Sequence, residues 1–269
     1  MKKKTAYGLF ILFYFLLFLS CEMKTDWDIQ PSEKFLVADC IITNEFKYHT
    51  VRLYRSTDDL NQLPSGVPGA DIELFFNDSI IAFAPQAGED GEYRSTVPFM
   101  ASAGNDYRLV IAVEGIIDTA WATMVAISPL EMFEIVAYDS LFRFIYKAGN
   151  QPSMTEINYN WEDAPDYCET YGSCRASEVF YTLDNIDIGK MFAPDRKVIP
   201  FPENTEIVRR KYSLSEEYQH FIRSLLLETE WRGGFFDVEQ GNVPTNFRHG
   251  IRGWFAACMV LSDTTYFGQ

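Results

Sequence analysis

Positive charge and histidine are both scarce in this sequence. Its 269 residues include 23 lysines and arginines against 38 aspartates and glutamates, for a formal net charge of −15, and only three histidines. A surface with this excess of acid repels phosphate groups, which excludes nucleic acid as an expected partner. Hydrophobic residues make up 47% of the chain. This composition excludes a disordered chain, a collagen and a coiled coil, and it predicts a globular protein of one or two domains with a sizeable core.

Common catalytic motifs are also absent. The sequence has no Gly-x-Ser-x-Gly, no His-Glu-x-x-His, no phosphate-binding glycine loop and no dinucleotide-binding glycine pattern. His49 begins a predicted strand and is expected to be partly buried, whereas His220 lies opposite the apolar side of a predicted helix and is expected to be exposed. We therefore expect no enzymatic activity, no metal and no cofactor. A hydrolase that uses dispersed acidic residues is an alternative, because carboxylates are abundant.

The N-terminus has the pattern of an export signal. Lys2, Lys3 and Lys4 form a basic start, and residues 6–20 are nearly all apolar. This run is shorter than the about 20 residues that span a bilayer as a helix, so it is typical of a signal peptide. Its end, Phe18-Leu19-Ser20-Cys21, resembles the lipobox of bacterial lipoproteins. The resemblance implies cleavage before Cys21 and attachment of diacylglycerol to its thiol; an ordinary secretory signal is the alternative.

Cleavage at this position defines the mature chain. Residues 1–20 are then the signal peptide, residues 21–34 form an acylated tether, and loss of three lysines changes the net charge from −15 to −18. Two or three acyl chains hold a protein firmly at a membrane. Residues 22–28 are polar and contain three acids. They resemble the export tract that sends lipoproteins of Bacteroidota to the outer face of the cell, so we expect a lipid-anchored outer-membrane protein that faces the exterior.

Four cysteines remain after Cys21. Cys168 and Cys174 lie six residues apart in a loop-like stretch, and in an oxidising compartment this spacing predicts a loop-closing disulfide. Zinc is the alternative, but no further Cys or His pair at ligand spacing completes a site. Cys40 and Cys258 lie in apolar, strand-like runs and are expected to be buried free thiols.

Alternating polar and apolar residues predict a mainly β fold. Between residues 35 and 127, about seven short strands are separated by turns rich in Gly, Pro, Asn and Asp. Residues 70–76 show the pattern most clearly, with apolar side chains at every second position, which indicates an antiparallel sheet with one wet face. The number and spacing of these strands predict an immunoglobulin-like or transthyretin-like sandwich.

A second, larger β-rich domain is predicted from residue 128 to residue 269. It contains further strand patterns and one amphipathic helix at about residues 214–230. Ser213 and Glu216 have the spacing of a capping box at the start of this helix. Six apolar residues at helical spacing form one side of it: Leu214, Tyr218, Phe221, Ile222, Leu225 and Leu226.

Aromatic residues near loops and glycines are the main candidates for ligand binding, together with two basic residues beside them. Exposed aromatic side chains stack on sugars or anchor a protein partner, but in a β-rich domain they also fill the core. The candidates are Trp161, Tyr171, Trp231, Arg248, His249 and Trp254. A binding role predicts that Trp161, Trp231 or Trp254 is exposed beside a concave surface.

Short motifs in a fixed order along the chain carry a family resemblance. They are Cys21-Glu22, Phe35-Leu36-Val37, Ile42-Thr43-Asn44-Glu45, His49-Thr50-Val51-Arg52-Leu53, Arg55-Ser56, Val67-Pro68-Gly69-Ala70, Gly91-Glu92-Tyr93, Gly104-Asn105-Asp106-Tyr107-Arg108-Leu109, Gly241-Asn242-Val243-Pro244-Thr245-Asn246 and Gly253-Trp254-Phe255. Over essentially the whole mature chain, this order resembles the exported lipoprotein family of Bacteroidota catalogued as domain of unknown function 4249. The resemblance implies no catalytic residues. It does imply a genomic neighbourhood, since such lipoproteins are often encoded beside TonB-dependent outer-membrane transporters.

The sequence therefore favours a non-enzymatic surface lipoprotein of the outer membrane that helps a TonB-dependent transporter to capture or take up its ligand. Two alternatives stay open. One is an autonomous glycan- or peptide-binding lipoprotein that uses the aromatic loops, and the other is the hydrolase with dispersed acidic residues.

Overall fold

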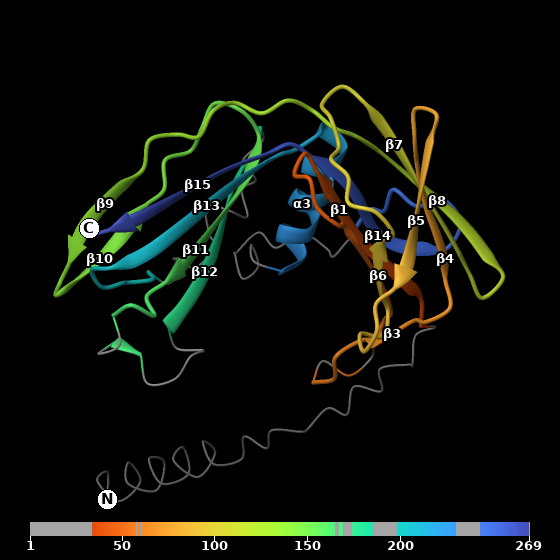
Figure 1. Ribbon diagram of the computed structural model, residues 1–269, viewed down its shortest axis with the longest axis horizontal. Coiled ribbons are helices and arrows are strands. Elements are labelled where there is room, and N and C mark those ends of the chain that lie inside the picture. Colours follow the sequence, from red (N-terminus) through yellow and green to blue (C-terminus); the bar gives the residue numbers. More distant parts are fainter. Residues whose placement is uncertain are drawn as a thin grey trace, which may run out of the picture. The chain divides into compact units, whose positions relative to one another are not determined.

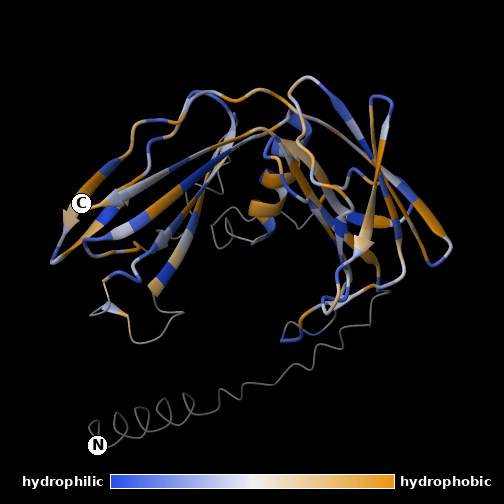
Figure 2. Cartoon of the chain, in the orientation of Figure 1, coloured by the Kyte–Doolittle hydropathy of each residue, from blue (hydrophilic) through white to orange (hydrophobic). Residues whose placement is uncertain are grey.

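The computed structural model describes residues 34–57, 59, 61–164, 167–168, 174–184, 198–229 and 243–268 (Figure 1). The predicted signal peptide and Cys21 lie outside these ranges, as does nearly all of the predicted tether. Within them the chain is mainly β with one helix, which confirms the predicted fold class. Figure 2 shows hydrophobic and hydrophilic residues alternating along several strands, as expected where one face of a sheet meets the core.

The larger sheet, here called the first sheet, contains nine strands. They are β1 (Leu36–Thr43), β2 (Thr50–Arg55), β3 (Ser65–Gly66), β4 (Asp71–Phe76), β5 (Ser79–Pro85), β6 (Glu92–Ser95), β7 (Asp106–Val113), β8 (Ile116–Thr123) and β14 (Ile251–Cys258). Their order is β14-β1-β2-β6-β5-β4-β7-β8, with β3 paired to β2. Because the end strands β8 and β14 also come together, the predicted sandwich takes the form of one nearly closed sheet.

The core of the first sheet follows the two-residue period of its strands. In β4, Ile72 and Leu74 are buried while Asp71 and Glu73 are exposed, which confirms the alternation predicted for residues 70–76. β14 comes from beyond the boundary predicted near residue 127, and it pairs in parallel with β1, with Cys40 opposite Phe255. The strands of the first sheet are therefore drawn from both predicted domains.

The segment before β14 closes the gap between β8 and β14. The Asn246 amide nitrogen donates to the carbonyl oxygens of Trp121 (2.8 Å) and Phe255 (2.7 Å), and the amide oxygen accepts from the Phe255 N–H at 3.0 Å. One side chain thus replaces a missing stretch of strand by bonding the backbones of both edges. Phe247, which is buried, forms a β-bridge with Ala120 beside it.

A buried carboxylate fixes the next turn. Asp118 in β8 is fully buried, and its two oxygens accept from the backbone N–H groups of Arg248 (2.7 Å) and Ile251 (2.9 Å). Since a buried carboxylate is tolerated where hydrogen bonds satisfy it, these contacts hold the start of β14 against β8.

The smaller sheet, the second sheet, has four antiparallel strands. They are β11 (Ser153–Asn160), β12 (Arg175–Thr182), β13 (Thr205–Ser213) and β15 (Val260–Phe267), in the order β12-β11-β13-β15. The hairpin of β9 (Glu134–Tyr138) and β10 (Leu141–Ile145) covers one face, where Phe142 and Phe144 pack on a cluster that includes Ile157, Tyr159 and Phe201.

Helix α3 (Glu216–Thr229) lies between the two sheets, in the position and range predicted (Figure 1). Its buried residues Tyr218, Ile222 and Leu226 pack with side chains of β14 and with Met154 and Tyr181 of the second sheet. The predicted capping residue was wrong, because the Tyr218 N–H donates to Ser215 Oγ (3.3 Å), whereas Ser213 Oγ accepts from the Met259 N–H. Within the described ranges, no helix is long and apolar enough to span a bilayer.

His49 is more deeply buried than predicted. Its ring packs against that of Phe99 in a tilted arrangement, with ring centroids 4.4 Å apart, and its Nε2 lies 3.2 Å from the Phe99 carbonyl oxygen. Burial lowers the pKa of His49 to about 4, with the positive charge of Lys47 acting in the same direction. The imidazole is therefore neutral at pH 7 and acts as part of the core.

Loss of stability at mildly acidic pH is expected from this histidine. An unfolded His49 takes up a proton near pH 6.5, whereas the folded form takes it up only near pH 4. The contribution of the neutral imidazole to the free energy of unfolding is thus fully present above pH 6.5. It falls as the pH drops towards 4, by at most about 3 kcal/mol at 1.4 kcal/mol per pKa unit. Urea unfolding from pH 7 to pH 4.5 should show a shallower decline for His49→Gln than for the wild type, and parallel curves would contradict this role.

Candidate functional site

The four cysteines after Cys21 are arranged as predicted. Cys168 and Cys174 form a disulfide with their Cα atoms 5.1 Å apart, so their sulfurs are not available as zinc ligands. Cys40 and Cys258 are buried free thiols. Burial raises the pKa of both, to about 12 for Cys258, so these thiols stay protonated and act as core residues.

The candidate binding residues are not brought together in one place. Tyr171 and Trp231 lie outside the described part of the chain. Trp161 is partly buried and packs against the core between the second sheet and the β9–β10 hairpin. Arg248 and His249 are exposed in the turn that Asp118 holds.

Trp254 is the predicted candidate that borders a hollow. The residue is only 9% exposed, because its indole stacks on Phe221 (ring centroids 4.8 Å apart) and on Tyr218 (6.1 Å) of α3. Neither described tryptophan among the candidates therefore has the broad exposure that the binding interpretation predicts. Trp254 instead lines one side of the cleft described next.

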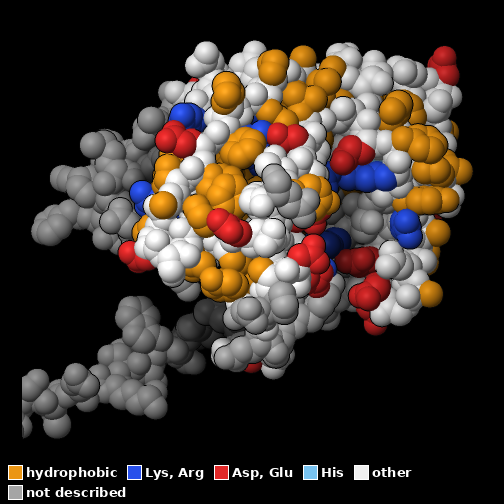
Figure 3. All heavy atoms as spheres, turned by 60° about the vertical axis from the view of Figure 1, so that its left-hand side comes forward, with side chains coloured by type: hydrophobic (Ala, Val, Ile, Leu, Met, Phe, Trp, Pro, Cys, Tyr) orange, Lys and Arg blue, Asp and Glu red, His pale blue; other side chains and the backbone are white. Residues whose placement is uncertain are grey.

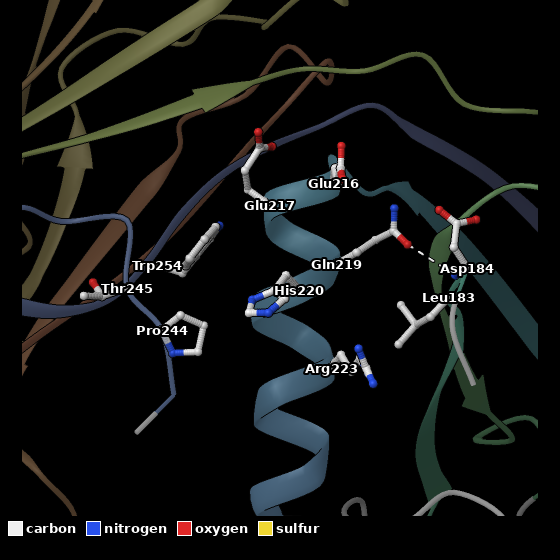
Figure 4. A pocket seen from close by; sticks show the side chains of 10 residues that line it. All are labelled: Leu183, Asp184, Glu216, Glu217, Gln219, His220, Arg223, Pro244, Thr245 and Trp254. Atoms are coloured by element: carbon white, nitrogen blue, oxygen red, sulfur yellow. Dashed lines mark hydrogen bonds between the residues drawn. The ribbon is translucent and has the colours of Figure 1, made fainter. Parts of the chain in front are cut away.

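A cleft of about 710 Å³ lies along the polar side of α3 (Figure 4). We call it the α3 cleft. Its lining residues come from the end of β12, from α3, from the segment before β14, and from β14 itself: Leu183, Asp184, Glu216, Glu217, Gln219, His220, Arg223, Pro244, Thr245 and Trp254. A smaller cavity of about 380 Å³ shares Glu217, Thr245 and Trp254 with it and continues towards Trp121.

Helical spacing explains why α3 supplies half of this lining. Glu216, Gln219, His220 and Arg223 recur at three- and four-residue intervals, so they share the side opposite to the apolar stripe. His220 is exposed there, as predicted. The Asp184 N–H donates to the Gln219 side-chain oxygen at 3.3 Å, which connects the end of β12 to the helix.

The chemistry of the α3 cleft is mixed. The lining combines the carboxylates of Asp184, Glu216 and Glu217 with the imidazole of His220 and the guanidinium of Arg223, and Trp254 contributes an apolar edge. Such a lining offers hydrogen-bond donors and acceptors of both signs, which suits a polar ligand. Among the described residues, no three His, Cys, Asp or Glu side chains are grouped closely enough to hold a metal ion. Figure 3 shows acidic, basic and hydrophobic side chains interspersed on one face of the molecule.

Sequence reasoning identified Trp254 but not the helix residues that accompany it. The available signal was the set of polar residues on the side of α3 away from the core. That pattern is also typical of any solvated helix surface, so it does not distinguish a cleft from open solvent.

The fold and the cleft define a mainly β protein with a nearly closed nine-stranded sheet, a second sheet, and a polar hollow beside the helix between them. The family model described as Domain of unknown function (DUF4249) matches residues 22–264, and the chain belongs to this family, as predicted. A search of the curated proteins found no match.

Two of the motifs that predicted the family meet in the structure. The hydroxyl of Tyr93 donates to the Val67 carbonyl oxygen at 2.7 Å and accepts from the Ala70 N–H at 2.9 Å. Gly91 adopts a φ of 80°, and a Cβ on it would lie 2.3 Å from the Leu53 carbonyl oxygen. Both motifs therefore have a structural reason to be present.

Proposed function

We propose that this protein is a non-enzymatic surface lipoprotein of the outer membrane that helps a TonB-dependent transporter to capture or take up its ligand. The observation that carries the proposal is the N-terminal pattern, in which a basic start and an apolar run end in Ser20-Cys21. The family membership supports the link to a transporter, through the genomic neighbourhood that the family resemblance implies. Acylated Cys21 is the membrane attachment in this proposal, and the domain that follows presents the α3 cleft.

The α3 cleft supports a role in capture. It is large enough for a small polar molecule or a short stretch of a longer one, and its donors and acceptors come from three separate parts of the chain. A net charge of −18 after cleavage keeps such a domain dissolved beside an anionic membrane.

Replacement of Cys21 tests the anchor. Cys21→Ala is expected to abolish incorporation of labelled fatty acid and to release the protein from the membrane fraction, because no other thiol lies at the cleavage position. Cys258→Ala, which removes a buried thiol, should keep the label and the membrane location. Labelled Cys21→Ala protein would disprove the lipobox assignment.

Isolation of the native protein tests the partner. Pull-down from detergent-solubilised outer membranes should recover a β-barrel transporter together with the wild-type protein. Repeated recovery of the lipoprotein alone, under conditions that keep other outer-membrane complexes intact, would contradict the accessory role.

An autonomous glycan- or peptide-binding lipoprotein is the second candidate function. The mixed polar lining of the α3 cleft favours it, since that lining needs no second protein to be complete. Ligand binding by the purified protein in the absence of any transporter would distinguish this candidate from the first.

A further inference from the structure

Among the described residues, the second sheet has a partly uncovered face on the side away from the β9–β10 hairpin. In adjacent antiparallel strands, directly opposite residues point to the same side. Asn160 in β11 lies opposite Arg175 in β12 and Glu206 in β13, and Glu206 in turn lies opposite Tyr266 in β15. These four side chains therefore form a line across the whole sheet, which we call the polar row.

A shallow hollow lies over the polar row. Its volume is about 570 Å³, and its lining includes Asn158, Asn160, Arg175, Ser177, Glu206 and Val208. Tyr266 stands at the end of the row and is 52% exposed. The other end of this face, around Met154, Tyr181 and Tyr212, is covered by α3. The polar row is thus on the part of the face that the helix leaves open.

Hydrogen bonds hold the side chains of the row in place. The Asn160 side-chain oxygen accepts from the Glu162 N–H at 3.2 Å, and the Arg175 guanidinium donates to Glu162 Oε1 at 3.3 Å. The Tyr266 hydroxyl donates to Glu206 Oε1 at 2.9 Å. Because these groups are already ordered, a ligand that bonds to them loses less conformational freedom on binding.

The chemistry of the row selects a class of ligand. The charge of Arg175 is paired with that of Glu162, and the carboxylate of Glu206 accepts from a hydroxyl but keeps its charge, so the row presents hydrogen-bond groups with one negative charge in excess and no excess of positive charge. Val208 is one of the apolar residues that line the hollow. Such a surface matches a neutral, hydroxyl-rich molecule better than a phosphate or an apolar segment.

The spacing of the row selects the shape of that ligand. Neighbouring strands lie about 4.8 Å apart, so four strands present four groups along about 14 Å. A pyranose ring is about as long as one strand spacing, which places one sugar of an extended chain over each strand, while the ring of Tyr266 stacks on a sugar face. We propose that the polar row binds an extended neutral oligosaccharide that lies across the strands of the second sheet.

This inference rests on the second candidate function, glycan binding, but assigns it to a surface other than the α3 cleft. Isothermal titration calorimetry on the purified mature protein tests it, with maltohexaose, cellohexaose, xylohexaose and mannohexaose as probes. At least one probe is expected to bind. Asn160→Ala and Tyr266→Ala should each weaken that binding about tenfold, and Tyr266→Phe, which keeps the ring, should weaken it less.

Two control variants separate the polar row from other surfaces. Tyr138→Ala removes an exposed tyrosine from the β9–β10 hairpin, and His220→Ala alters the α3 cleft; neither should change the affinity. The proposal is overturned if none of the four hexasaccharides binds, if Asn160→Ala and Tyr266→Ala leave the affinity unchanged, or if His220→Ala abolishes it. A failed transporter pull-down leaves this outcome unaffected, so the two proposals fail independently.

Discussion

Replacing Glu131 with alanine is expected to lower the free energy of unfolding by about 3 kcal/mol. Glu131 Oε1 lies 2.6 Å from the Nζ atom of Lys211, a lysine side chain with no exposed surface. Without the carboxylate, the buried ammonium keeps only neutral acceptors, Ser128 Oγ at 2.8 Å and the Pro129 carbonyl oxygen at 3.1 Å. The lower end of the range for broken buried ion pairs applies because the Glu131 side chain is 26% exposed. Urea unfolding at pH 7 measures the loss.

Two further variants show whether the unpaired lysine is the cause. Lys211→Met in the Glu131→Ala background should recover most of the loss, since an apolar side chain in the same space needs no partner. Glu134→Ala removes the partner of Lys147 from an ion pair whose two side chains are about half exposed, so it should cost less than about 1 kcal/mol. A double variant no more stable than Glu131→Ala alone would contradict the explanation.

This ion pair fixes the connection between the first sheet and the β9–β10 hairpin. Residues 124–133 join β8 to β9, and Lys211 and Arg209 of β13 hold the second half of that segment. Arg209 donates to the Glu131 carbonyl oxygen at 2.9 Å and pairs with Asp263 of β15. Two buried cations on one strand thus attach the connector to the second sheet, which makes this segment part of the folded unit.

The fold class could be predicted because it depends on local patterns. Alternation in residues 70–76 marks a strand with one buried face, and the apolar positions from Tyr218 to Leu226 mark a helix with one buried side. Pairing could not be predicted in the same way. The residue pattern of β14 predicts a strand, but nothing within it indicates that Gly253 pairs with Ala38, more than 200 residues earlier. The single nearly closed sheet follows from that distant pairing.

The helix cap and the buried polar residues were missed for a related reason. Ser213 and Glu216 have the spacing of a capping box, but Ser213 ends β13 and its hydroxyl is bonded to the Met259 N–H, which leaves Ser215 to cap α3. In the sequence, Asp118 and Asn246 are indistinguishable from other polar residues of a strand and a loop. Their roles depend on backbone groups that only the tertiary structure brings to them.

The α3 cleft also could not be predicted, because only the tertiary structure brings its lining residues together. Its residues come from the end of β12, from one side of α3, from the segment before β14 and from β14 itself, and none of the four parts has an unusual sequence. What joins them is the position of β14, since Trp254 both packs under α3 and borders the cleft. The site therefore depends on the contact between β14 and β1, and a substitution that separates these two strands tests that dependence.

Gly253→Ala is expected to destabilise the protein by about 2 to 6 kcal/mol, because a strained backbone and a forced displacement of packed strands each cost about 1 to 3 kcal/mol. Gly253 has a φ of 95°, a backbone conformation that residues with a side chain rarely adopt. A Cβ on it would lie 2.1 Å from the Ala38 carbonyl oxygen. That oxygen belongs to the backbone of β1, so no side-chain rotation relieves the clash. Chemical unfolding and soluble yield measure the effect.

Gly250→Ala is the matched control for this prediction. Gly250 has a φ of 123°, but no atom lies within 4 Å of a Cβ built on it, so alanine there meets strain without a clash. It should cost less than Gly253→Ala. The Gly253 variant should also change the fluorescence of Trp254, since β14 must move away from β1 and carry the indole with it. Equal losses from the two variants, with unchanged fluorescence, would mean that backbone conformation alone governs this strand and that the contact with Ala38 does not position the wall of the α3 cleft.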